Sequence, residues 1–124
     1  MLTTTDYLEL LTMEPDLTFF YHDRPVLYTV QRNTEKYLIS LSDEDNEKQS
    51  ETFLLVKFAD ATFALLEEKL LTPKEFFTHP DNTVYLATIE YTEHNGKVIT
   101  QGEQYADNTT IPDAYLPTAD ARWK

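Results

Sequence analysis

The acidic stretch between residues 42 and 50 carries the densest set of groups that could do chemistry. Asp43, Asp45 and Glu47 alternate along it, with Glu44 between the first two, and carboxylate oxygens are the ligands that calcium prefers. A calcium loop of the EF-hand type also needs a glycine for its sharp turn and a bidentate acid at its end. Residues 48 to 50 supply neither. The pattern therefore favours a solvated hairpin tip, whose four acids are candidate contacts for a partner rather than metal ligands.

Histidine and glycine are too sparse for the common catalytic and cofactor motifs. The three histidines, His22, His79 and His94, fall in expected turns without the regular spacing of a metal site, and the chain has no cysteine. Gly96 and Gly102 are the only glycines, so neither a nucleophile elbow nor a glycine-rich phosphate loop can form. We therefore expect no cofactor, no metal and no catalytic residue that a motif identifies.

Scattered carboxylates leave one enzymatic hypothesis open. The fold could bring together Asp and Glu residues that are distant in sequence, as in a glycosidase. A small carboxylate-dependent enzyme would need two acids, or an acid and a histidine, in one cleft with perturbed pKa values.

The charge balance narrows the class of partner. The 124 residues include 22 acids and 10 bases, for a net charge of −12, and such a surface repels nucleic acid and anionic membranes. No apolar run approaches the roughly 20 residues that span a bilayer, and the N-terminus has no secretory apolar region, so we expect a cytoplasmic protein. The same charge motivates a second hypothesis: an acidic, nucleic-acid-mimicking inhibitor of a DNA- or RNA-binding protein, of phage or defence origin.

Aromatic residues favour a hypothesis of another class, a non-enzymatic protein that acts through protein–protein contacts. The chain has eight Tyr and seven Phe, and Tyr and Trp are favoured interface anchors. Beyond residue 102, Tyr115, Leu116 and Trp123 are apolar anchors at wide spacing. We expect this extended tail to cover its own domain, or a second copy in a homodimer, with Tyr115 or Leu116 as the main contact.

Apolar and β-branched residues predict the sheet that positions these groups. Residues 36–41 and 52–58 form two apolar arms on either side of the acidic link, the pattern of a long antiparallel hairpin at the centre of a sheet. Further strands are expected over residues 17–21, 26–32, 83–91 and 98–100, with an Asn-Gly turn between the last two. The first four strands would form a meander.

Capping residues predict three helices. Boxes at residues 3–6 and 72–75 start short helices, and Asp60 caps the main helix, over residues 61–70. The stripe expected to be buried on the main helix is Phe63, Leu66 and Leu70. Together these elements predict a single α+β domain: an N-terminal helix over 1–16, an α+β core over 17–101 and an extended tail over 102–124.

The central stretch resembles a bacterial domain family of unknown function. The likeness lies in residues 25–28, 36–41, 43–45 and 53–56 and covers roughly residues 17 to 89, with the following helix, short segment and strand in the family's order. One departure is Lys69-Leu70-Leu71, where the family often has a glycine. The resemblance implies a small bacterial protein and carries no catalytic residue across.

Overall fold

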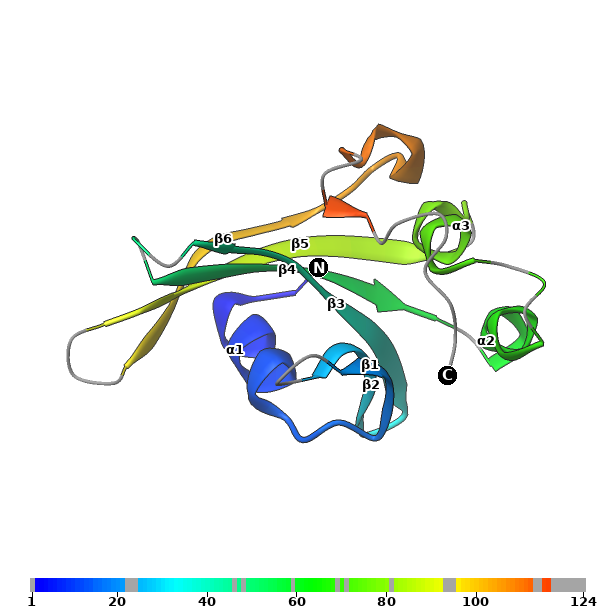
Figure 1. Ribbon diagram of the computed structural model, residues 1–124, viewed down its shortest axis with the longest axis horizontal. Helices are drawn as coiled ribbons and strands as arrows, with labels where there is room; N and C mark the ends of the chain where they lie inside the picture. The colour runs from blue at the N-terminus through cyan, green and yellow to red at the C-terminus, as the bar shows by residue number, and fades with distance from the viewer. Residues whose placement is uncertain are drawn as a thin grey trace.

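A six-stranded antiparallel sheet organises the chain (Figure 1). The computed structural model describes residues 2–21, 25–45, 47, 49–58, 60–68, 70, 72–80, 82–92, 96–112 and 115–116. In chain order the elements are α1 (Thr4–Thr12), β1 (Leu17–Tyr21), β2 (Pro25–Arg32), β3 (Glu35–Asp45), β4 (Ser50–Lys57), α2 (Asp60–Glu67), α3 (Pro73–Thr78), β5 (Thr83–Tyr91), β6 (Lys97–Gln104) and a 3-10 turn, η1 (Asn108–Thr110). The strands lie in the order β1-β2-β3-β4-β5-β6. The predicted α+β fold, a small antiparallel sheet with short helices, is thus confirmed.

The β3–β4 hairpin forms the centre of the sheet, as its two apolar arms predict. Residues 37–40 and 53–56 are buried without interruption, because helices cover both faces of the sheet at this level. The hairpin is longer than predicted: β3 continues to Asp45, and β4 begins at Ser50, its partner. A bulge between Leu41 and Asp43 shifts the register, so the acidic residues extend the ladder instead of forming a free link.

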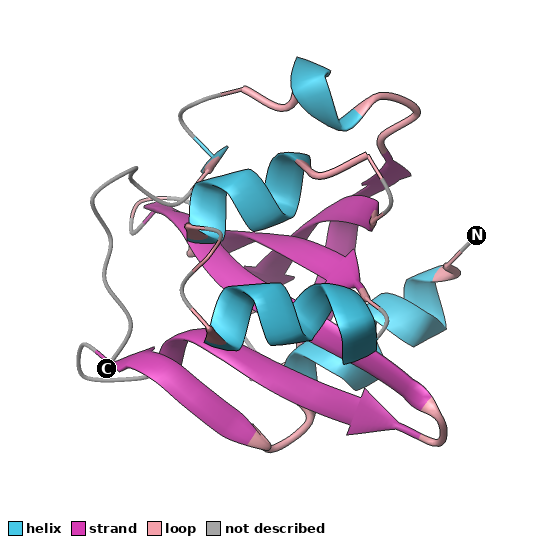
Figure 2. Ribbon diagram, turned by 90° about the vertical axis from the view of Figure 1, so that its right-hand side faces the viewer, coloured by secondary structure: helices cyan, strands magenta, loops and turns pink. Residues whose placement is uncertain are grey.

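Two hydrophobic clusters lie on opposite faces of the sheet. One joins α1 to alternate residues of the strands, and the other joins α2, α3 and the residues after β6 to the remaining ones. Figure 2 shows α2 and α3 in front of the sheet and α1 behind it. Residues of β4 illustrate the division, since Leu54 and Val56 belong to the second cluster while Phe53 and Leu55 belong to the first.

The sheet curls around α1 (Figure 1). The helix begins at the predicted capping box, in which the Thr3 hydroxyl accepts from the Asp6 N–H and the Asp6 carboxylate accepts from the Thr3 N–H. Arg32 of β2 pairs with Asp6 at 2.8 Å, and Tyr7 packs against Gly102 of β6. The helix therefore connects strands that are far apart in the sheet order.

The second helix, α2, is shorter than predicted. Phe63 and Leu66 are buried as expected, but Leu70 is 64% exposed, so its assignment to the buried stripe was wrong. The Leu70 N–H bonds to the Leu65 carbonyl, five residues back instead of four, which marks the point where the chain leaves the helix. The predicted helix after Thr72 is present as α3, with its capping box. Among the described residues the α-helices are short: α1 has 9 residues, α2 has 8 and α3 has 6.

The C-terminal segment is more regular than predicted. Strand β6 continues to Gln104, beyond the predicted start of the tail at residue 102, and η1 follows where extended chain was predicted. Ile111 and Leu116 are buried in the cluster of α2 and α3. In the part of the chain that is described, no helix is both long and apolar enough to span a bilayer.

Candidate functional site

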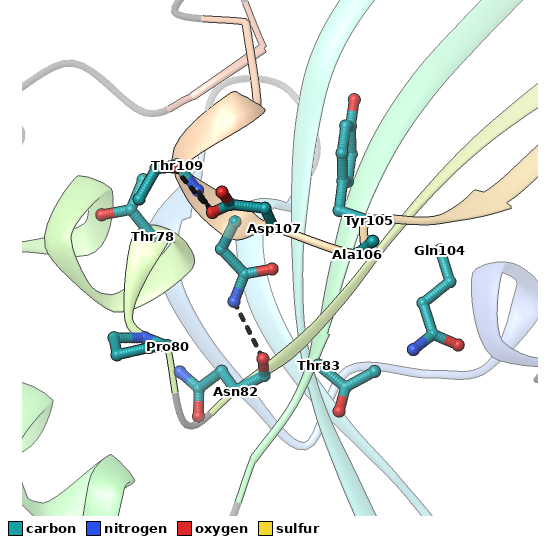
Figure 3. A pocket seen from close by; sticks show the side chains of 10 residues that line it. Thr78, Pro80, Asn82, Thr83, Gln104, Tyr105, Ala106, Asp107 and Thr109 are labelled. Carbon is teal, nitrogen blue, oxygen red and sulfur yellow. Dashed lines mark hydrogen bonds between the residues drawn. The ribbon is translucent and has the colours of Figure 1, made fainter.

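A polar hollow of about 450 Å³ opens between α3, the start of β5, the end of β6 and η1 (Figure 3). Its lining residues are Thr78, Pro80, Asn82, Thr83, Gln104, Tyr105, Ala106, Asp107, Asn108 and Thr109. Most of these are amides and hydroxyls. The acidic hairpin tip lies at the other end of the central strands, since Asp45 is paired with Ser50 at the start of β4 and Thr83 with Lys57 at its end.

Asn108 is the buried centre of this hollow. Its Nδ2 donates to the carbonyl oxygens of His79 and Asn82, both at 2.8 Å. Asn82 is also buried, and its own Nδ2 donates to the Phe76 carbonyl at 2.9 Å. The two amides thus tie η1 to the end of α3 and to the turn that leads into β5. Sequence reasoning treated this Asn as part of an irregular tail, because its bonding partners lie 26 and 29 residues away.

The carboxylate of this hollow belongs to Asp107, which caps η1. It accepts from the Thr109 hydroxyl at 2.6 Å and from the Thr109 N–H at 2.9 Å. These two bonds, the hydroxyl first, lower the pKa of Asp107. A carboxylate held in its charged form by its own turn stabilises local structure, and a general acid would need the opposite shift.

A second hollow, of about 260 Å³, lies between α2 and the start of β3. It is lined by Asp16, Leu17, Thr29, Val30, Lys36, Phe58, Asp60, Phe63 and Glu67. Lys36 Nζ lies 2.9 Å from Asp60 Oδ1, and this hydrogen bond raises the pKa of Lys36. A cationic ligand would therefore compete with the protein's own lysine for Asp60.

The described residues offer no cluster of three or more His, Cys, Asp or Glu side chains that could hold a metal ion. The densest charged group joins α1, β2, β3 and β4 through ion pairs: Arg32 contacts Asp6 and Glu35, and Lys57 contacts Glu35. Beside it, burial raises the pKa of the Tyr37 hydroxyl to about 12. That hydroxyl stays protonated at neutral pH, which makes it a poor base and a poor nucleophile.

The four predicted acidic contacts gather at the far end of the β3–β4 hairpin. Asp43, Glu44 and Glu47 are exposed, whereas Asp45 is half-buried and accepts from the Glu47 N–H at 3.1 Å. Glu44 lies directly opposite Glu51, which is buried and accepts a hydrogen bond from the Tyr91 hydroxyl. Like charges opposite each other weaken a strand pair, so this end of the hairpin is held by backbone pairing and not by its charges.

The tail residues contact their own chain. Leu116 is 9% exposed and Tyr115 packs against the same cluster of α2 and α3. The Ser42 hydroxyl donates to the Tyr115 carbonyl at 2.6 Å, so the tail crosses the central hairpin. Trp123 lies outside the described residues, as do His22 and His94.

The border of the sheet at β6 is exposed along most of its length. This eight-residue strand pairs with β5 alone among the described strands, and seven of its residues are exposed, with Ile99 half-buried. Val98 is a large apolar residue with 47% of its surface exposed. The opposite border, β1, has five residues and two irregularities in its pairing with β2. Sequence reasoning missed the extent of β6 because a strand exposed on both faces has no alternating pattern.

Two backbone hydrogen bonds establish which backbone groups of β6 point away from the sheet. Tyr105 N–H bonds to the Val84 carbonyl, and Thr92 N–H bonds to the Gly96 carbonyl. In an antiparallel pair, bonded and non-bonded residues alternate. Ile99 pairs with Ile89 and Gln101 with Thr88, so Thr100 is an extra residue that forms a bulge. The alternation along β6 therefore shifts by one residue at Thr100. The outward residues of β6 are therefore Lys97, Ile99, Gly102 and Gln104.

Comparison with known proteins gives no family model, no curated protein and no solved structure that matches this chain.

Proposed function

We propose that the protein works without catalysis, by binding another protein chain through the outer edge of β6. The observation that carries the proposal is a row of backbone N–H and C=O groups that points outward along an eight-residue strand. Such a row is a template for an added strand. Side chains support this reading, because no charge interrupts the run from Val98 to Gly102, in a chain whose net charge is −12.

A proline at an outward position tests the proposal. Gln104→Pro removes an outward N–H and leaves the inward bonds of β6 intact, since proline is tolerated at such positions of edge strands. Gln104→Ala is the matched control, because it removes the same exposed side chain and keeps the N–H. We expect affinity purification of the tagged chain from its host to recover a partner with Gln104→Ala and to lose it with Gln104→Pro. Equal recovery with both variants would contradict the proposal.

A second candidate function, mimicry of nucleic acid, draws on the acids at the hairpin end. Asp43 and Asp45 lie two residues apart in β3, a spacing of roughly 7 Å. Asp45 is paired with Ser50 of β4, and Ser50 is paired in turn with Glu90 of β5. Acids on one face of the sheet thus lie on β3 and β5, with Ser50 of β4 between them. The triple variant with Asp43→Asn, Asp45→Asn and Glu47→Gln should fold normally and bind a DNA-binding partner more weakly, with a smaller salt slope. An unchanged salt slope would remove this candidate.

The third hypothesis, a carboxylate-dependent enzyme, gains no support from a specific contact in the described residues. The bacterial family that the central stretch resembles has no assigned function, so the resemblance gives no support to any of the three hypotheses.

A further inference from the structure

The outward backbone groups of β6 have an irregular spacing. Lys97 and Ile99 are two positions apart, Ile99 and Gly102 are three, and Gly102 and Gln104 are two again, because the bulge at Thr100 interrupts the alternation. In a regular strand, outward groups recur at every second residue. A regular strand from another protein could therefore match the outward groups on one side of the bulge only.

A second copy of β6 carries the same irregularity at the matching place. Two strands related by a two-fold axis pair antiparallel, and each residue meets the one equally far from the axis. With the axis between Thr100 and Gln101, Lys97 of one copy meets Gln104 of the other, and Ile99 meets Gly102. Each of the four outward residues then lies opposite an outward residue of the other copy. If the two-fold axis passed through any other point of β6, at least one outward residue would lie opposite a residue whose backbone groups point inward, or opposite a residue beyond the end of the strand.

Side chains agree with this register. Ile99, in register with Ile89, and Gly102, in register with Ala87, belong to the face that carries α1, as residues paired across a continuous sheet must. Gly102 has no side chain and lies against the ring of its own Tyr7, so the half-buried Ile99 of the second copy would meet a bare backbone beside an aromatic ring.

Charge at the edge also favours a second copy over an acidic or basic partner. The strand carries one base, Lys97, and one acid, Glu103, so its charges cancel. The rest of the chain does not share this balance, and two copies at −12 each repel one another at long range. Salt screens that repulsion without weakening backbone hydrogen bonds.

We propose that two copies of the chain pair through β6, antiparallel, about a two-fold axis between Thr100 and Gln101, so that their sheets become continuous. This inference rests on the proposed function, because it names the partner of the same edge. The pairing is concentration-dependent and strengthens as ionic strength rises.

Cysteine pairs can test the register, because the chain has no cysteine of its own. In the proposed register Val98 lies opposite Glu103 of the other copy in a non-bonded pair, with Cα atoms about 4.5 Å apart, within the reach of a disulfide. We expect an equimolar mixture of Val98→Cys and Glu103→Cys proteins to form a cross-linked dimer under mild oxidation. Neither variant alone should do so, because the two copies of residue 98 lie roughly 15 Å apart. A mixture that cross-links no better than the single variants overturns the register.

Molar mass measures the pairing itself. Light scattering over a range of protein and salt concentrations should give a dimer for the unmodified chain and for Gln104→Ala, and a monomer for Gln104→Pro. A monomer for all three at every condition overturns the proposal of a second copy. If Gln104→Pro nevertheless loses a host partner that Gln104→Ala retains, the proposed function stands and the occupant of the edge is another protein. If both variants keep the same partners, the proposed function falls as well.

Discussion

Asn108 offers the sharpest test of how the C-terminal segment is held. Its side chain is 7% exposed and gives two hydrogen bonds of 2.8 Å to the carbonyls of His79 and Asn82. Asn108→Ala removes both hydrogen bonds, so the carbonyl oxygens of His79 and Asn82 lose this donor. A net loss of about 1 kcal/mol for each bond, with a further cost for an unsatisfied buried acceptor, gives about 3 kcal/mol in total. For a domain of this size the melting temperature should fall by roughly 10 °C.

Urea denaturation followed by circular dichroism measures this loss directly. Gln104→Ala is the control from the wall of the same hollow, because Gln104 is exposed and its loss should stay within about 0.5 kcal/mol, as is usual for surface sites. A loss of stability for Asn108→Ala no larger than that of the control would contradict this reasoning. It would show that the two hydrogen bonds do not hold η1 against the end of α3 and the turn before β5.

The pH dependence of Asn108→Asp gives an independent check. The introduced carboxylate would face two carbonyl oxygens in a buried place, so its pKa in the folded state should rise above its ordinary value of about 4. The protonated form is then the one that the fold favours. The loss in free energy of unfolding, relative to the unmodified chain, should be smallest for this variant below about pH 4 and should grow as the pH rises through the raised pKa. The loss for Asn108→Ala should not change with pH. A loss for Asn108→Asp that shrinks as the pH rises would refute the reasoning.

Three further predictions concern the two helix layers. Leu66→Ala should destabilise by about 2–5 kcal/mol because Leu66 is fully buried, while Leu70→Ala should stay within about 0.5 kcal/mol; equal losses in urea denaturation would contradict the placement of α2. Gly102→Ala should cost about 1–3 kcal/mol, since a Cβ there would lie 2.6 Å from the Tyr7 ring, and a double-mutant cycle with Tyr7→Ala should recover much of the loss. The Thr3 N–H, with help from Arg32, lowers the pKa of Asp6, so the stability that Asp6→Asn removes should be present above about pH 4 and vanish as the pH falls through the lowered pKa; a deficit that persists in acid would count against the capping box.

Local signals explain what could be predicted from the sequence. Both capping boxes were identified because all their atoms lie within four residues, and the helices they start are present as α1 and α3. The central hairpin was identified because burial on both faces demands a continuous apolar run. Leu70 was misplaced because its spacing from Leu66 fits a helix that, in the structure, has already ended.

Non-local contacts explain what could not be predicted. Nothing in the residues around Asn108 shows that His79 and Asn82 will lie beside it, and no local pattern shows that Ser42 will hold the tail at Tyr115. The extent of β6 was also hidden, because residues 100–104 are exposed and polar on either face. The candidate interaction edge thus depends on an element that has no signature of its own until its neighbour, β5, is in place.

The contact between Tyr7 and β6 has a consequence for synthesis on the ribosome. The Tyr7 hydroxyl donates a hydrogen bond to the Glu103 carbonyl, 96 residues further along the chain. The surface against which α1 packs is therefore complete only when β6 has formed. A nascent chain that has emerged up to β5 would therefore leave the Tyr7 side of α1 exposed, although β2 to β5 already supply most of the cluster under the helix. Early folding would depend on the β2–β3–β4 ladder, and the layer under α1 would close last. A stalled chain of that length should be a substrate for chaperones, although the complete chain buries the same surface.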